Sequence, residues 1–283
     1  MSQTVLSVRG LIKSYADVVA VNGIDLDIYK GEIFALLGPN GAGKSTTIEI
    51  LEGFRKRDAG VVSVLGIDPS EEGLKAQELR NRIGIVLQTS GDAGDLTVEE
   101  CISHFSHYYS SPRNPNQVID AVGLTEKRKA LIRNLSGGQR RRLDVALGII
   151  GSPELLFLDE PTTGFDPEAR RHFWELVRSL RDEGTTIVLT THYLDEAEAL
   201  ADRVGVINLG SIIEIATPST LGGRESAKAR ITWRENGELR EGFSDQPTHF
   251  VQELSSRLGE VPELQVIRPS LEDIYLEMIG EKR

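Results

Sequence analysis

The chain has 283 residues, a formal net charge of -11 at pH 7 and a pI of about 5.1, and this acidic balance argues against a general nucleic-acid binder, which needs a basic surface. Its single cysteine, Cys101, excludes an intrachain disulfide and fits a reducing, cytosolic setting. The start of the chain shows no secretory-signal pattern, and no apolar run approaches the roughly 20 residues of a membrane helix, so we expect any membrane role to come through a partner.

Residues 4–37 are predicted to form strands joined by turns. Ile24, Leu26 and Ile28 alternate with polar residues, which is the period-two pattern of a half-buried strand. Tyr15 lies in a polar segment before these residues. Its ring could stack on an adenine base or pack in the core or a turn, and the local pattern leaves both open.

The next stretch carries the pattern of a phosphate-binding loop. Residues 33–37 predict a buried strand, and residues 45–51 predict a helix. Between them the sequence fits G-x-x-x-x-G-K-[ST]. The matching residues are Gly38, Pro39, Asn40, Gly41, Ala42, Gly43, Lys44, Ser45 and Thr46. Backbone amides and the helix dipole would bind phosphate there, so we expect a nucleoside triphosphate, with Lys44 at its β/γ-phosphates and the Ser45 hydroxyl on Mg²⁺.

Residues from about 88 to 152 are predicted to be mostly helical. Gln88 directly follows an expected strand at 83–87, where it could touch both a metal and a neighbouring segment. Within the helical region, residues 97–100 form a capping box that should open a helix.

A second anion-binding pattern lies at residues 135–139, Leu-Ser-Gly-Gly-Gln, where a serine and two glycines precede a helix. The three arginines that follow, residues 140–142, could contact nucleic acid. Because Asp144 lies beside them and the chain is acidic overall, a solvated helix face is the favoured interpretation.

An apolar strand at 155–158 ends in two acids, Asp159 and Glu160. Asp159 could hold Mg²⁺ or its water. Because side chains alternate along a strand, Glu160 is expected to point the other way and to polarise a water against the γ-phosphate. The acids could instead cap a helix. Another buried strand, residues 186–190, precedes His192, whose imidazole could contact the γ-phosphate or be structural.

These motifs together resemble the nucleotide-binding subunit of ATP-binding cassette (ABC) transporters. The pentapeptide at 135–139 matches the family signature, and it lies between the phosphate loop and the acid pair at 159–160, as in the family. The resemblance covers about residues 4–220. It implies an α/β fold with a P-loop NTPase core, an antiparallel β subdomain and a helical subdomain at about 88–152, within a nucleotide-binding domain that spans residues 1–220.

The resemblance also implies roles for single residues. Tyr15 looks like the adenine-stacking aromatic, Gln88 like the residue that senses Mg²⁺ and the attacking water, and His192 like the switch histidine. Glu160 would be the general base, with Lys44 and His192 on the γ-phosphate, and Mg²⁺ would be held by Ser45, Asp159 and Gln88.

The family pattern further implies a homodimer arranged head to tail, bound to an integral membrane permease on the cytoplasmic face of the cell membrane. Each ATP would lie between one phosphate loop and residues of the other subunit, namely Ser136, Gly137, Gly138, Gln139 and Asp166. Asp166 ends the sequence Thr-Gly-Phe-Asp, whereas the family more often has Ser-Gly-Leu-Asp there.

Residues 221–283 are predicted to form a small α+β accessory domain. Alternating residues from 227 to 234 and an Asn-Gly pair at 236–237 predict a hairpin, and helices are expected near 250–258 and from Ser270 onward. The final segment, residues 269–275, resembles the tail of export ATPases of the daunorubicin-resistance type.

The sequence therefore predicts the ATPase subunit of an ABC exporter of drugs or other hydrophobic small molecules. Two alternatives remain. One is the ATPase of an importer. The other is a soluble ABC ATPase acting on ribosomes or DNA, which the single P-loop and the lack of a long coiled coil disfavour.

Overall fold

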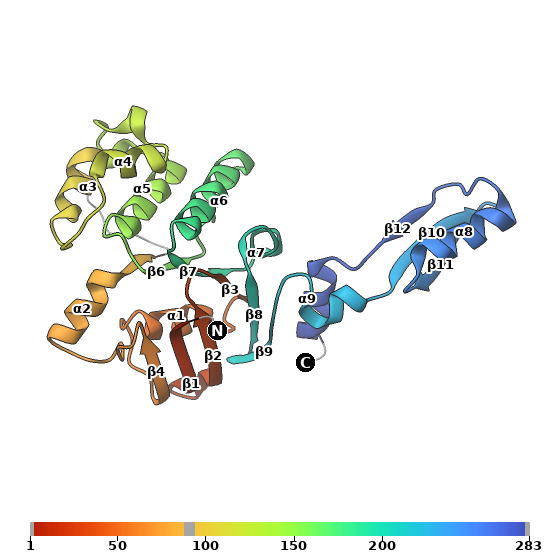
Figure 1. The fold of residues 1–283 in the computed structure, drawn as a ribbon, viewed down its shortest axis with the longest axis horizontal. Helices are drawn as coiled ribbons and strands as arrows, with labels where there is room; N and C mark the ends of the chain where they lie inside the picture. The colour runs from red at the N-terminus through yellow and green to blue at the C-terminus, as the bar shows by residue number, and fades with distance from the viewer. Residues whose placement is uncertain (1–2, 88–93, 281–283) are drawn as a thin grey trace. The chain divides into compact units, whose positions relative to one another are not determined.

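The computed structural model describes residues 3–87 and 94–280. Its contacts divide the chain into two compact units, residues 1–213 and 214–283 (Figure 1). This division falls inside β9 (Ser211–Ala216). Because a domain boundary is better placed outside a strand, we keep the predicted boundary between residues 220 and 221 as a proposal.

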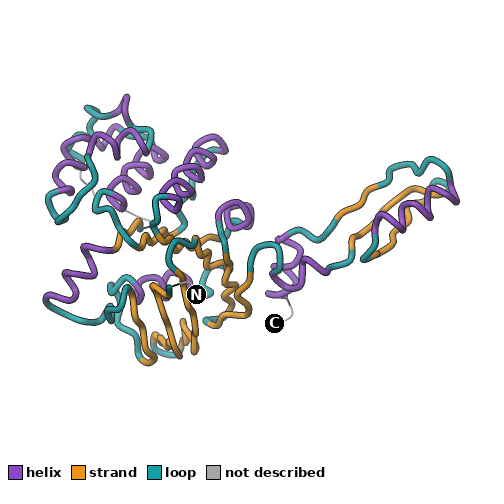
Figure 2. The backbone as a smooth tube through the Cα atoms, viewed as in Figure 1, coloured by secondary structure: helices purple, strands orange, loops and turns teal. Residues whose placement is uncertain are grey.

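The core of the first unit is a six-stranded sheet in the order β5-β6-β7-β3-β8-β9, and the pairs from β5 through β8 are parallel. Figure 2 colours the strands orange and the helices purple. The strands before β9 are β5 (Ile83–Val86), β6 (Leu155–Asp159), β7 (Thr186–Thr191), β3 (Ile33–Leu37) and β8 (Arg203–Asn208). The residues of β3 are all buried, as the continuous apolar run predicts for a strand covered on both faces. The parallel arrangement brings the carboxyl ends of β3, β6 and β7 to one edge of the sheet.

A three-stranded antiparallel sheet, in the order β2-β1-β4, accompanies this core. Its strands are β1 (Thr4–Tyr15), β2 (Val18–Tyr29) and β4 (Ala59–Val64). Alternate residues of β2, including Ile24, Leu26 and Ile28, are buried, which confirms the period-two pattern.

The α-helices of the first unit are α1 (Lys44–Leu51), α2 (Leu74–Arg82), α3 (Val98–Ser106), α4 (Pro115–Ala121), α5 (Gly137–Ile149), α6 (Pro167–Asp182) and α7 (Leu194–Leu200). Two of them begin at capping boxes, of which the one at residues 97–100 was predicted. Thr97 caps α3 with Glu100, and Ser136 caps α5 with Gln139. Across the described part of the chain, no helix is both long and apolar enough to cross a membrane.

The second unit contains an antiparallel sheet in the order β11-β10-β12. Its elements are β10 (Ala229–Glu235), β11 (Glu238–Ser244), α8 (Pro247–Leu258), β12 (Gln265–Ile267) and α9 (Leu271–Gly280). Ile231, Trp233 and Leu254 form its core, with Phe250 packed against them. The turn at Asn236 and Gly237 has positive φ at both residues, as a two-residue hairpin of this sequence requires.

Candidate nucleotide-binding site

The loop between β3 and α1 is shaped by its glycines. Gly43, the N-cap of α1, has φ 102°, and a Cβ there would lie 2.3 Å from the carbonyl oxygen of Ala20. A Cβ on Gly38 would lie 2.4 Å from the carbonyl oxygen of Ile207. Any larger residue at either position would force the backbone apart, so the loop stays narrow, with the N-terminus of α1 behind it.

Lys44 is held at this loop by its own backbone. Its Nζ donates to the carbonyl oxygens of Gly38 at 2.8 Å and Pro39 at 3.2 Å, and the side chain is 5% exposed. Burial lowers the pKa of the ammonium, and the charges of Glu160 and Asp159 oppose that effect. The result is a desolvated cation in the loop, where its attraction for phosphate is strong.

A pocket of about 430 Å³ brings several of the predicted residues together. It is lined by Tyr15, Ala20, Asn40, Gly41, Gly43, Lys44, Ser45, Thr46 and Glu160. Tyr15 is 37% exposed at this pocket, with Arg55 5.2 Å from its ring centroid. A half-exposed ring beside a phosphate loop can stack on a base.

Asp159 ends β6, and its Oδ1 accepts a hydrogen bond from the hydroxyl of Thr190 on β7. A carboxylate and the Ser45 hydroxyl are hard oxygen ligands. Mg²⁺ is commonly bound in this way, by one or two protein oxygens together with substrate phosphates. The residues therefore fit this ion. Gln88, the third predicted ligand, lies outside the described residues.

Strand alternation is not what directs Glu160, so that part of the expectation is wrong. β6 stops at Asp159, and Glu160 has φ 45°, a left-handed conformation that L residues rarely adopt. Its amide donates to the hydroxyl of Thr190 at 3.1 Å and to the carbonyl oxygen of the same residue at 3.2 Å. The reversed backbone, fixed by β7, directs the carboxylate toward the phosphate loop.

The Glu160 carboxylate meets two of the other predicted residues. Its Oε1 lies 3.2 Å from Nδ1 of His192 and 3.8 Å from Nζ of Lys44. The side chain of Glu160 is 13% exposed. A carboxylate, an imidazole and an ammonium therefore converge beside the loop, and such groups can position a water and stabilise charge in phosphoryl transfer.

The signature residues and Asp166 have structural roles within the chain. The Ser136 hydroxyl accepts from the amide of Gln139 at 3.3 Å. Asp166 caps α6, and its bonds from the amides of Ala169 and Glu168 lower the pKa of its carboxyl. Of the described residues, those lining the Lys44 pocket include neither the signature nor Asp166.

The phenylalanine that departs from the family pattern, Phe165, is 8% exposed and packs edge-to-face on Phe173 of α6, with ring centroids 5.9 Å apart. The larger side chain therefore anchors the loop before Asp166 to α6.

Arg141 corrects a second expectation. Of the arginines at 140–142, predicted to form a solvated helix face, Arg141 is only 7% exposed, and its guanidinium bonds to backbone carbonyls. The neighbouring charges suggested an exposed side chain. They could not reveal that α5 packs against the strand ends, because that is a long-range contact.

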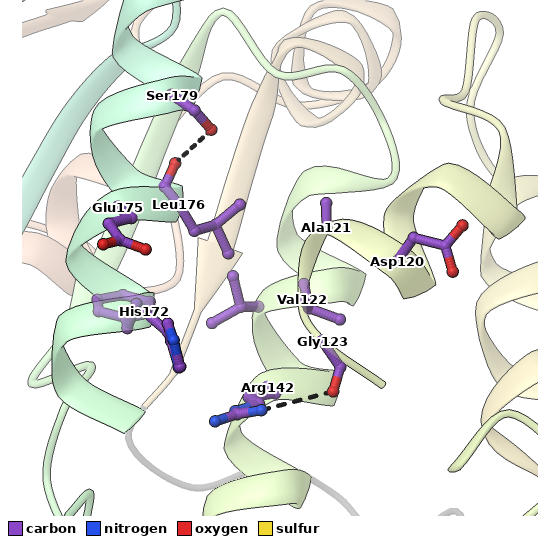
Figure 3. Close-up of a pocket in the computed structure, with 11 residues that line it drawn as sticks. Asp120, Ala121, Val122, Gly123, Arg142, His172, Glu175, Leu176 and Ser179 are labelled. Atoms are coloured by element: carbon purple, nitrogen blue, oxygen red, sulfur yellow. Dashed lines mark hydrogen bonds between the residues drawn. The ribbon is translucent and has the colours of Figure 1, made fainter. Parts of the chain in front are cut away.

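A separate pocket of about 530 Å³ lies between the end of α4, α5 and α6 (Figure 3). Its rim includes Arg142, which donates to the carbonyl oxygen of Gly123 at 3.4 Å. None of the predicted site residues lines it.

Glu52 is a further residue near the site that the sequence reasoning missed. This C-cap residue of α1 is 7% exposed, and burial, followed by the charges of Asp159 and Glu49, raises the pKa of its carboxyl to about 8. Only its position directly after the phosphate-loop helix could have drawn attention to it.

We expect Glu52→Gln to stabilise the ligand-free protein at pH 8 by on the order of 1–3 kcal/mol, with a smaller gain at pH 5. The folded state retains a proton that the unfolded state loses above its ordinary pKa of 4.5, so wild-type stability falls as pH rises from 4.5 to about 8. Urea unfolding at pH 5, 6.5 and 8 in EDTA would measure this, with the exposed Glu72→Gln as control. A pH slope in Glu52→Gln equal to that of the wild type would contradict it.

A glycine-built phosphate loop facing a strand-end acid pair defines this protein as a P-loop nucleoside triphosphatase. More specifically, the chain belongs to the ABC transporter family, whose family model matches residues 21–163. It is thus an ABC ATPase subunit, as its motifs predicted.

Relatives and solved structures agree with this assignment. The daunorubicin/doxorubicin resistance ATP-binding protein of Streptomyces peucetius is 43% identical over 221 residues, covering 76% of this chain and 66% of that protein. The Nod factor export ATP-binding protein I of Burkholderia orbicola is 36% identical, covering 100% of this chain and 99% of that protein. A dimeric ATP-binding cassette bound to ADP and Pi superposes with a TM-score of 0.69 at 22% identity, covering 75% and 98% of the two chains, and this likeness shows the fold alone.

Proposed function

We propose that this chain is the MgATP-hydrolysing subunit of an exporter of drugs or other hydrophobic small molecules. The observation that carries the chemical part is the placement of the Glu160 carboxylate between His192 and Lys44, at 3.2 and 3.8 Å. Export is supported by the relatives, which are named for drug resistance and for Nod factor export.

In this mechanism Glu160 accepts a proton from the water that attacks the γ-phosphate. Lys44 and His192 hold the γ-phosphate, and Tyr15 stacks on the adenine. Ser45, Asp159 and Gln88 would hold Mg²⁺, which when bound would neutralise charge on the phosphate oxygens.

The head-to-tail dimer and the permease complete the proposal. The N-terminus of α5, capped by Ser136, offers amides to a triphosphate held by the Lys44 loop of a second subunit. A separately encoded permease, bound at the cytoplasmic face of the membrane, would convert closure of this dimer on ATP into transport.

We expect tagged Glu160→Gln protein with MgATP to capture a multi-pass membrane protein from detergent-solubilised membranes of the source cell. The reason is that slow hydrolysis would hold the ATP-bound dimer closed. Mass spectrometry and stoichiometry of the bound fraction would measure it, with Lys44→Ala, which should not close on ATP, as control.

Capture of ribosomes or other soluble machinery without a permease would contradict the transport assignment. Once the permease is known, ATP-driven uptake of daunorubicin into inverted vesicles would support export. ATP-driven loss of the compound from the same vesicles would indicate an importer.

A further inference from the structure

Arg141 on α5 contacts the backbone on both sides of Glu160, the proposed general base. Its Nε donates to the carbonyl oxygen of Pro161 at 3.0 Å, its Nη2 to that of Asp159 at 2.6 Å, and its Nη1 to that of Leu87. All three acceptors are backbone oxygens at or just beyond the ends of β5 and β6. One buried side chain therefore connects the signature helix to two neighbouring strand ends.

Two of these acceptors flank Glu160 directly. The carbonyls of Asp159 and Pro161 are fixed by Arg141, while the amide of Glu160 is fixed by Thr190 from β7. The left-handed φ of 45° at Glu160 costs free energy and persists only where its surroundings hold the backbone on both sides. Arg141 fixes this backbone from the side of α5, in the helical subdomain.

The chemistry of this contact requires a guanidinium. Its donors are arranged in a rigid planar fork, which can reach three fixed carbonyls at once, whereas a lysine ammonium is a point charge on a flexible stem. Burial lowers the pKa of Arg141, and the carboxylates of Asp144, Asp159, Glu196 and Glu160 oppose this effect, so the surrounding acids favour the charged form.

We propose that Arg141 is a positioning residue that couples the signature helix to the catalytic carboxylate. It touches no substrate. It holds the backbone turn that directs Glu160 at the attacking water, so the carboxylate is aligned when α5 is seated against the strand ends. The proposal rests on the function of Glu160 as the general base.

The test compares Arg141→Met with the wild type in steady-state ATP hydrolysis and in equilibrium binding of a fluorescent ATP analogue. We expect kcat to fall by about 10- to 100-fold, because misorientation of a catalytic group costs rate, while the Kd for nucleotide changes less than about threefold. Arg141→Lys, which keeps the charge but not the fork, should recover only part of the rate.

Two controls separate positioning from general destabilisation. Ile149→Ala removes a buried side chain, 1% exposed, from the same helix and should lower thermal stability with little change in kcat. Arg178→Met removes an arginine that also donates to a carbonyl oxygen, that of Ala199 at 2.8 Å, on an exposed part of α6. If Arg141→Met folds poorly, the same comparison is made with Arg141→Lys.

A double variant decides whether Arg141 acts through Glu160. In the Glu160→Gln background, Arg141→Met should change the residual rate by less than about twofold, since the group it positions is already gone. Multiplicative losses, or a nucleotide affinity that falls by the same factor as kcat, would overturn the proposal. If Arg141→Met turns over normally while Glu160→Gln is inactive, only the positioning role of Arg141 is overturned. If Glu160→Gln itself turns over normally, Glu160 is not the general base.

Discussion

Glu160→Gln is expected to bind ATP with near wild-type affinity and to hydrolyse it about 10²- to 10⁴-fold more slowly. Glutamine keeps the size of the side chain and can still contact His192, which lies 3.2 Å from the carboxylate, but it accepts no proton from the attacking water. Lys44 and the loop residues proposed to hold the triphosphate remain in place in this variant. Single-turnover phosphate release and equilibrium nucleotide binding would separate the two effects.

The matched control is Glu253→Gln in the second unit, where the exposed carboxylate faces His249 at 3.8 Å and so reproduces an acid–imidazole contact away from the site. It should leave both rate and affinity unchanged. If Glu160→Gln instead retained near-normal turnover, another group would have to accept the proton. A loss of binding equal to the loss of rate would show that Glu160 shapes the loop rather than the chemistry.

The phosphate loop and the signature helix could be predicted because their geometry is set locally. Glycines permit the loop backbone, and Ser136 caps its helix with a residue three positions away. The α/β fold with a P-loop core was implied by the family resemblance of these motifs, and the structure contains the corresponding six-stranded sheet. For the loop and the helix start, the information lies within a few residues of sequence.

The features that the sequence could not supply depend on contacts between distant segments. The direction of Glu160 comes from a left-handed backbone held by β7, not from the alternation of its own strand. Arg141 is buried because α5 lies against the ends of β5 and β6, although its neighbours in sequence suggested a surface. Such contacts join residues 18 and more positions apart, beyond the reach of any local pattern.

The proposed dimer gives a role in ATP binding to two predicted site residues that lie outside the Lys44 pocket. Ser136 and Asp166 each cap a helix, and neither lines that pocket among the residues described. A helix N-terminus that does not line the Lys44 pocket of its own chain can bind the phosphates of an ATP held by a second copy. In a two-fold dimer both sites would then be formed from a loop of one subunit and a signature of the other.

Mixing two inactive variants is therefore expected to restore hydrolysis. Lys44→Ala removes the loop cation, and Ser136→Arg blocks the signature amides, so each homodimer should have no competent site. In a mixed dimer one site would carry both changes and the other neither. With random association and independent sites, an equal mixture should recover about a quarter of wild-type activity.

The measurement is phosphate release from the mixture at concentrations where the dimer forms, against each variant alone at the same total concentration. Each variant mixed with Glu160→Gln offers a stricter control. Lys44→Ala with Glu160→Gln should stay inactive, because both lesions lie on the loop side of the site and no mixed dimer is then intact. Ser136→Arg with Glu160→Gln should recover. If no mixture recovers activity, either the signature and the loop form a site within one chain, or both sites of a dimer must be intact for turnover. Nucleotide-dependent dimerisation of the mixture without hydrolysis would identify the second case.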